Sequence, residues 1–245
     1  MDTLTPRLDI LPAEQVRLWP QLRPIKRLGF VLYGGTAIAL RLGHRKSVDF
    51  DFFTSRPVDR DALRRALPFL NKSQVQQDSK DTYEVVTQET VKVSFFGGLD
   101  FGRVKPPSET ADGVMRVASL DDLMATKLKV ILQRSAAKDY QDLAAMIRAG
   151  VKVENALAAA ERMFKPTFPP AESLRAMVYF EGGDMARLAA ADRKVLIEAA
   201  ARVRELPSIS IQADLSLHET IASPGVAPKI PPRIDPPSPG PRMRL

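Results

Sequence analysis

The chain has 245 residues, a length that fits one domain of moderate size or two small ones. Its 44% hydrophobic and 27% charged residues are typical of an ordinary globular protein. The absence of cysteine excludes disulfides, Cys-based zinc sites and thiol nucleophiles, and two histidines are too few for a histidine-rich metal site. The net charge of +7 favours an anionic partner such as a nucleotide, DNA or RNA, although part of that charge lies near the C-terminal end.

The chain shows no targeting or membrane signal. Its first residues, MDTLTPRLDILPAEQ, lack the basic start and the apolar core of a signal peptide. No apolar run approaches the ~18 residues that a membrane-spanning helix needs. We therefore expect a cytoplasmic protein with no membrane partner.

Helices and strands alternate in the first half of the chain. Apolar spacing and turn residues predict helices over residues 13–23, 37–42 and 60–70 and strands over 30–33, 48–53, 83–87 and 91–96. In the first helix, Val16, Leu18 and Trp19 are expected on the apolar side. Thr36 is placed to cap the second helix, and Gly43 to end it in a left-handed conformation.

The second half reads as helical after an irregular stretch over residues 99–117. Ser119 followed by Asp122 has the spacing of a capping box, which indicates a helix start. Helices are predicted from 120 to about 132 and over 138–148, 153–163, 171–181 and 190–205, and a proline-rich segment begins at 223. We predict an α+β fold, with a mixed sheet and helices over 1–118, a helical bundle over 119–207 and a disordered tail over 208–245.

The most informative stretch is a glycine turn followed by two aspartates. Gly34 and Gly35 lie at a predicted strand-to-helix junction, where backbone amides can approach a phosphate. Asp49 and Asp51 are two residues apart in a predicted strand, so they point to one side while Val48, Phe50 and Phe52 point to the other. Paired carboxylates repel each other unless a cation such as Mg²⁺ lies between them. If the two strands are neighbours, this pattern predicts a metal-nucleotide site.

Basic residues flank the motif and recur in a later block. Arg45 either binds phosphate or is merely solvated. Lys127 falls on the apolar stripe of its helix, so it either extends past the core rim to solvent or faces a triphosphate. Asp139 and Asp142 could pair with Arg134 or Lys138, cap a helix or act in catalysis. Tyr140 is expected to pack, and His44 to make a local hydrogen bond.

Residues 31–53 and the block from Lys127 to Asp142 closely resemble the AbiEii/AbiGii nucleotidyltransferase toxin family, which includes MenT-type toxins. This family belongs to the DNA polymerase β-like nucleotidyltransferase superfamily, and the resemblance covers roughly residues 11–205. It implies a nucleotidyltransferase-fold sheet and transfer of a nucleoside monophosphate from an NTP to an acceptor hydroxyl. It further implies a tRNA 3′ end or other RNA as acceptor, and a cognate antitoxin as partner.

The resemblance also implies roles for particular residues. These are Gly34, Gly35 and Thr36 for the nucleotide phosphates, Asp49 and Asp51 for Mg²⁺, Lys127 for the triphosphate, and Asp139 as a base or structural acid. Superfamily members often carry a third carboxylate on a later strand, where this chain has Ser94. Catalysis with two metals would therefore need Asp139 or another acid to compensate. The alternatives are another acceptor or a catalytically silent module that binds RNA or a partner protein.

Overall fold

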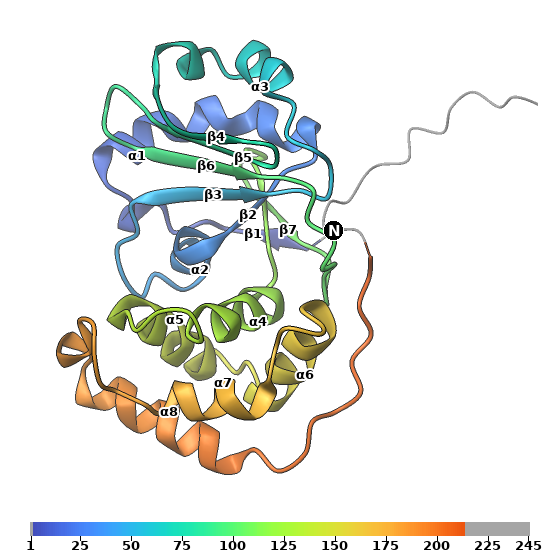
Figure 1. Ribbon diagram of the computed structural model, residues 1–245. Coiled ribbons are helices and arrows are strands. Elements are labelled where there is room, and N and C mark those ends of the chain that lie inside the picture. Colours follow the sequence, from blue (N-terminus) through green and yellow to red (C-terminus); the bar gives the residue numbers. More distant parts are fainter. Residues whose placement is uncertain (1, 214–245) are drawn as a thin grey trace, which may run out of the picture.

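The computed structural model describes residues 2–213, which form a mixed eight-stranded sheet and the helices that cover it (Figure 1). The strands are β1 (Thr3–Leu4), β2 (Val31–Tyr33), β3 (Asp49–Phe53), β4 (Gln74–Ser79), β5 (Thr82–Val86), β6 (Lys92–Phe96), β7 (Ser108–Thr110) and β8 (Arg116–Val117). The α-helices are α1 (Ala13–Leu18), α2 (Gly34–Leu42), α3 (Arg60–Ala66), α4 (Leu120–Val130), α5 (Ala137–Arg148), α6 (Val153–Met163), α7 (Pro170–Met177) and α8 (Ala190–Arg202). Short 3₁₀ helices are η1 (Leu8–Ile10), η2 (Trp19–Leu28), η3 (Pro68–Lys72) and η4 (Met185–Arg187).

The two strands of the glycine–aspartate motif are neighbours, as the metal-nucleotide hypothesis requires. The sheet order is β1-β7-β8-β2-β3-β6-β5-β4, with β2 antiparallel to β3 and β3 parallel to β6. Tyr33 pairs with Asp51, so the glycines that follow Tyr33 lie beside the two aspartates. Asp51 in turn pairs with Ser94 on β6. In Figure 1, α3 lies above the sheet and α2, α4 and α5 lie below it.

The alternation along β3 is confirmed, with one exception. Phe50 and Phe52 are fully buried, and the Phe50 ring lies 6.3 Å from the ring of Trp19 in η2. Asp49 and Asp51 are only partly buried on the opposite face. The prediction that Val48 joins the buried face is wrong: Val48 precedes the first residue of β3 and is 59% exposed.

The first predicted helix is shorter than expected. α1 ends at Leu18, and the chain continues as the 3₁₀ helix η2, which contains Pro20 and Pro24. Proline has no amide hydrogen to donate, so it weakens a regular α-helix. Val16, predicted on the apolar side, is 42% exposed, whereas Leu18 and Trp19 are buried as predicted.

The second helix begins three residues earlier than predicted, so Thr36 is not its cap. α2 starts at Gly34, and its N-cap is Tyr33, whose side chain caps no backbone amide. The buried Thr36 hydroxyl donates instead to the carbonyl oxygen of Asp49 and lies 2.8 Å from Ser47 Oγ. Thr36 therefore ties α2 to the start of β3. The predicted end is confirmed, because Gly43 has a φ of 63° and its amide bonds to Ala39.

Other boundaries also differ from the predictions. The edge strand β4 is exposed at every residue, so it lacks the apolar alternation that marks a strand. The short strands β7 and β8 occupy the stretch predicted as irregular. α3 ends at Ala66, before Pro68, and α7 ends at Met177.

The C-terminal half is helical as predicted. Ser119 caps α4, since its hydroxyl accepts a hydrogen bond from the amide of Asp122. One hydrophobic cluster runs from Leu11 to Leu196 through sheet and helices, and the division at residue 118 stays a prediction. The expected disordered tail from 208 does not hold for its first residues, because Gln212 pairs with Arg103 through two backbone hydrogen bonds. Residues 214–245, which hold the proline-rich segment, lie outside the described residues.

Candidate functional site

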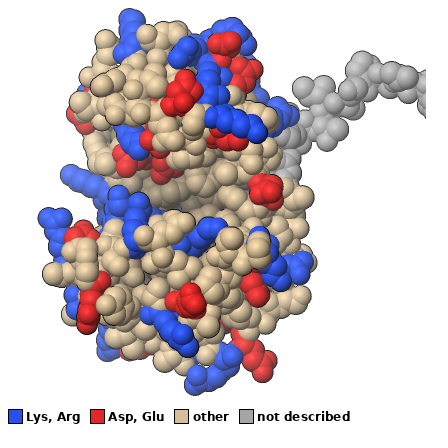
Figure 2. Space-filling model, viewed as in Figure 1, with Lys and Arg blue, Asp and Glu red and all other residues tan. Residues whose placement is uncertain are grey.

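A cleft of about 540 Å³ lies between the sheet and the helices below it. Its walls come from the glycine turn, β3, β6, α4 and the start of α5. Figure 2 shows a hollow between the upper and lower parts of the molecule, with basic side chains gathered at its left end and acidic ones along part of its upper margin. The lining residues that carry charge are Arg45, Lys46, Asp49, Asp51, Glu84, Lys92, Lys127, Arg134 and Lys138.

Asp49 and Asp51 both face this cleft, as the strand alternation predicts. Burial and then the negative charge of Asp49 raise the pKa of Asp51 to about 6, against the opposing charges of Lys127 and Lys92. Within residues 2–213, no group of three or more His, Cys, Asp or Glu side chains is placed to hold a metal ion. Two carboxylates nonetheless fit Mg²⁺, which is often held by one or two carboxylates together with substrate phosphates and water. A cation bound at the pair would favour the ionised form of Asp51 against the burial and the Asp49 charge that raise its pKa.

The glycine turn approaches Asp51 so closely that a side chain does not fit there. Gly34 has a φ of +72°, and a Cβ atom on it would collide with the Asp51 carboxylate. A Cβ atom on Gly35 would collide with the Arg45 guanidinium and lie 3.2 Å from Ser47 Oγ. The backbone amides at the start of α2 are thus free to meet an anion beside the two carboxylates.

If the cleft performs the nucleotidyl transfer that the resemblance implies, replacing Gly34 with alanine is expected to reduce that activity by about a hundredfold, because displacing a reacting group by roughly 1 Å costs that much. The matched control is Gly182→Ala, since Gly182 has a φ of +79° and no atom within 4 Å of an added Cβ. Both variants strain the backbone equally, but only Gly34→Ala pushes on Asp51. Rates at saturating nucleotide, with melting temperatures of both variants, test this; equal losses of activity would contradict it.

Behind the cleft, Lys127 is held by two buried aspartates. Its Nζ lies 2.6 Å from Asp139 Oδ1 and 2.7 Å from Asp142 Oδ2. Both aspartates are 0% exposed and Lys127 is 6% exposed. Lys127 therefore does not extend past the core rim to solvent, and it lines the cleft close enough to Asp51 to lower the pKa of that carboxyl.

Further cations share the same two aspartates. Arg134 Nε donates to Asp139 Oδ2 at 2.8 Å, and Arg45 donates to both oxygens of Asp142 at 2.7 and 2.8 Å. His44 Nε2 lies 2.7 Å from Asp142 Oδ1, which is the local hydrogen bond expected of it. Burial alone would raise the pKa of Asp142, but hydrogen bonds from His44 and Arg45 and the charge of Lys127 hold it well below its ordinary value.

The folded protein likewise favours the ionised form of Asp139, and both of its carboxylate oxygens accept hydrogen bonds. Burial opposes ionisation, but the hydrogen bond from Arg134 and the charge of Lys127 lower the pKa of Asp139. Of the roles left open above, pairing with Arg134 is the one observed, whereas Lys138 is exposed and lines the cleft. Three cations (Lys127, Arg134 and Arg45) thus share two aspartates. The network carries surplus positive charge toward the cleft even with His44 neutral.

The predicted nucleotide-binding residues divide into two groups. Gly34, Gly35, Arg45 and Lys127 line the cleft. Thr36 does not: it is 1% exposed and lies beneath the turn, where it bonds to the backbone of β3. Tyr140 packs in the core as expected, 1% exposed and hydrogen-bonded to Ala176.

Ser94, where the resemblance implies a third carboxylate, lies beside Asp51 in the sheet. Ser94 is fully buried opposite Asp51, and its Oγ has no hydrogen-bond partner within the described residues. The next residue in this cross-strand row is Glu84 on β5, which faces the cleft and pairs with Lys92 at 2.9 Å. Sequence reasoning missed both Glu84 and Lys92, although strand alternation and register together would have placed them there.

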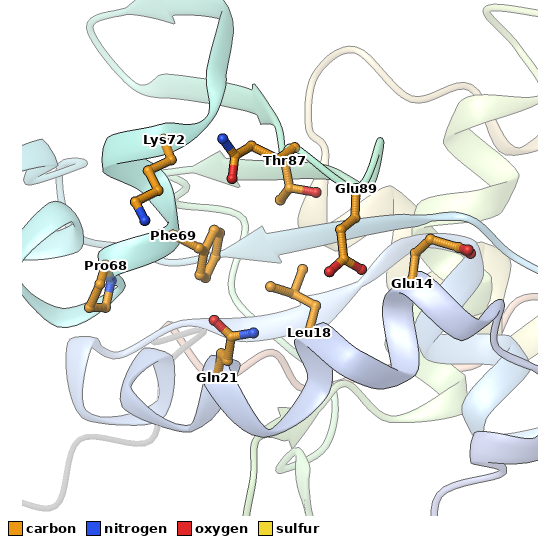
Figure 3. Close-up of a pocket in the computed structure, with 9 residues that line it drawn as sticks. Glu14, Leu18, Gln21, Pro68, Phe69, Lys72, Thr87 and Glu89 are labelled. Carbon is orange, nitrogen blue, oxygen red and sulfur yellow. The ribbon is translucent and has the colours of Figure 1, made fainter.

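A second cavity, of about 320 Å³, lies between α1, η2, η3 and the turn after β5. In Figure 3, Leu18 and Phe69 line it, with Glu14, Glu89 and Lys72 around them. Since η2 packs on the Phe50 face of the sheet, this cavity is on the face away from Asp51. The carboxylates that line this second cavity do not meet a cluster of basic residues comparable to the one in the cleft. The cleft is therefore the candidate site. Within residues 2–213, no helix has the length and apolar character to cross a membrane.

Comparison with known proteins identifies the family. Residues 21–177 match the family model described as "Nucleotidyl transferase AbiEii toxin, Type IV TA system". An uncharacterized protein of Aquifex aeolicus, aq_aa25, is 35% identical over 121 residues, which are 49% of this chain and 58% of that protein. The chain thus spans somewhat over half the length of that curated relative.

Two solved structures align with part of the chain. The Megavirus polyadenylate synthase aligns with a TM-score of 0.43 at 14% identity, over 55% of this chain and 31% of that one. The antibiotic-resistance factor ANT(2″)-Ia aligns with a TM-score of 0.43 at 15% identity, over 61% and 86%. The family match covers well over half of the chain and includes the glycine turn, both cleft aspartates and the buried lysine network. The chain belongs to the AbiEii nucleotidyltransferase toxin family.

Proposed function

We propose that the protein is a Mg²⁺-dependent nucleotidyltransferase that moves a nucleoside monophosphate from an NTP to an RNA hydroxyl, at the 3′ end of tRNA. In this proposal it is the toxin of a toxin–antitoxin pair, is neutralised by a cognate antitoxin, and acts in the cytoplasm, where NTPs and tRNA are found. The family match supports the reaction class, and the net charge of +7 favours a polyanionic acceptor.

One observation carries the proposal: carboxylates, helix amides and surplus cations meet in a single cleft. Asp49 and Asp51 would hold Mg²⁺, and the amides of Gly34 and Gly35 would meet the phosphates. When bound, Mg²⁺ neutralises charge on the transferred phosphate and orients it. The cation network around Lys127 would stabilise the charge that develops on the leaving pyrophosphate.

Asp139 fits the role of a structural acid better than that of a base in this proposal. Both of its oxygens accept hydrogen bonds, from Lys127 and Arg134, and it is absent from the cleft lining. A general base must reach the proton that it removes. Asp139 is therefore assigned to orienting Lys127, which in turn faces the phosphates.

The test is incubation of the full chain with Mg²⁺, total tRNA and each α-³²P-labelled NTP in turn. We expect label in tRNA with the native protein, and none with an Asp49→Ala, Asp51→Ala double variant. One NTP is expected to dominate, which names the nucleotide. Replacing Mg²⁺ with EDTA is expected to abolish labelling, because no ion would then offset the two carboxylates.

The other outcomes separate the alternatives. Label in the protein itself would point to a protein hydroxyl as acceptor and contradict the RNA part of the proposal. Measurable RNA binding without label from any NTP would favour a silent module. In that case Ser94, which pairs with Asp51 and stands where the resemblance implies a third carboxylate, is the first residue to replace with aspartate.

A further inference from the structure

A third cavity, of about 440 Å³, opens beside the cleft and is walled by aromatic rings. Phe53 and Phe96 line both the cleft and this cavity, so the two spaces adjoin at these rings. Phe101 and Phe164 complete the aromatic wall, with ring centroids 5.1 Å apart. All four rings are partly exposed rather than buried. A cluster of large apolar rings left open to solvent is a feature of binding surfaces rather than of cores.

The rim of this cavity is basic. Lys129 Nζ lies 4.5 Å from the centre of the Phe164 ring and 3.2 Å from Thr167 Oγ1. Lys165 is exposed on the same rim, and Asp100 is the one acidic residue among those that line the cavity. Flat rings beside cations are the combination with which proteins hold single-stranded nucleic acid, since bases stack on the rings and phosphates meet the cations.

The residues of strand β3 show the order in which the groups of the cleft and of the aromatic cavity follow one another. Gly34 lies against Asp51 in the middle of β3, Gly35 lies against Arg45 and Ser47 just before the strand, and the aromatic cavity begins at the last residue of the strand, Phe53. The four steps from Asp49 to Phe53 span about 13 Å. The carboxylates therefore lie between a cationic end and an aromatic end.

This order indicates where each of the two substrates, the NTP and the acceptor RNA, would bind. In an in-line displacement at phosphorus, the attacking and leaving oxygens lie on opposite sides of the transferred group. The cationic end around Gly35 and Arg45 suits the departing pyrophosphate. The acceptor hydroxyl must then approach from the aromatic end.

On the basis of the function proposed above, we propose that the cavity lined by Phe101 and Phe164 holds the unpaired terminal base of the acceptor RNA. The base stacks on these rings, and Lys129 and Lys165 meet the adjoining backbone phosphates. The terminal ribose then lies at the junction formed by Phe53 and Phe96, with its hydroxyl toward Asp51. Stacking reads the flat face that every base has, so this subsite favours single-stranded ends over paired ones.

The direct test uses a short single-stranded RNA that ends in 2-aminopurine, whose fluorescence is quenched when the base stacks. We expect quenching by the native full chain, and at least a tenfold weaker apparent affinity with Phe101→Leu, which keeps apolar bulk but loses the ring. Lys165→Ala is expected to weaken binding and flatten its salt dependence. The matched control is Phe69→Leu, because Phe69 is a partly buried ring in the cavity on the other face of the sheet. Absence of quenching by the native protein would overturn the assignment.

Steady-state kinetics supply the second readout. Phe101→Leu is expected to raise the KM for the acceptor at least tenfold while leaving the KM for the NTP unchanged. A raised KM for the NTP alone would mean that the cavity holds the base of the nucleotide, and the assignment to the acceptor would be wrong. If the native protein transfers nothing to any RNA, the proposed function fails. The fluorescence experiment still decides separately whether a base stacks in this cavity.

Discussion

Asp51→Asn is expected to lower nucleotidyl transfer by about a thousandfold or more and to abolish growth inhibition when the protein is expressed. The substitution keeps the shape of the side chain but removes one of the two charges that would hold Mg²⁺. A loss of a thousandfold corresponds to about 4 kcal/mol of transition-state stabilisation, which is within the range for an electrostatic group at a reacting centre. The measurement is the initial rate of labelling of RNA with an α-labelled NTP.

The same variant is expected to be more stable than the native protein in the absence of metal. Burial and Asp49 raise the pKa of Asp51 to about 6, so in the native chain ionising this carboxyl costs more than it does in the unfolded chain. The stability that the protonated Asp51 carboxyl contributes is fully present below about pH 4, and it is lost as the pH rises through 6. At pH 7.5 the substitution removes that penalty, which is on the order of 3 kcal/mol, and should raise the melting temperature by roughly 10 °C.

Two comparisons make this result informative. Asp61→Asn changes an exposed aspartate in the first turn of α3 and should alter neither activity nor melting temperature appreciably. Adding Mg²⁺ should stabilise the native protein but not Asp51→Asn, because only the native pair gains by binding it. An active Asp51→Asn variant would exclude the paired-carboxylate site, whereas an inactive variant with a lower melting temperature would show a folding defect.

The local part of the site could be predicted because its signals are adjacent in sequence. Strand alternation placed Asp49 and Asp51 on one face, and a glycine pair marked the turn beside them. The capping box at Ser119 likewise depends on residues three apart. Each of these inferences needs only the backbone geometry of one element, which the sequence carries locally.

The remaining features depend on which elements meet. Asp142 accepts hydrogen bonds from His44 and Arg45, 98 and 97 positions away, and no local pattern indicates that meeting. The register that places Glu84 beside Ser94 is set by pairing between β5 and β6. The aromatic cavity joins β3 and β6 to the end of α6, and each of its phenylalanines alone resembles an ordinary core residue. Thr36 matched the sequence pattern of a helix cap, but its hydroxyl instead donates a hydrogen bond to the backbone of β3.

Asp142→Asn is expected to destabilise the protein by about 3 kcal/mol, a drop of roughly 10 °C in melting temperature. Asp142 is fully buried and is the common partner of Lys127, Arg45 and His44. Without its charge, Lys127 is left with Asp139 alone, and the buried site holds an uncompensated cation. The matched control is Asp192→Asn, which weakens a pair with the half-exposed Arg148 and should cost under about 1 kcal/mol.

The pH dependence of unfolding separates this charge network from simple packing. Because the pKa values of Asp139 and Asp142 are lowered in the folded chain, the stability they contribute is present above about pH 4 and is lost as the pH falls below that value. The difference in unfolding free energy between the native protein and Asp142→Asn should therefore become smaller in acid. A packing defect would instead cost the same free energy at every pH. Urea unfolding of both proteins at pH 7.5 and at pH 3.5 measures this difference at each pH. A constant difference would mean that the charge of Asp142 does not account for the loss, and that the positive charge facing the cleft is held in place by other groups.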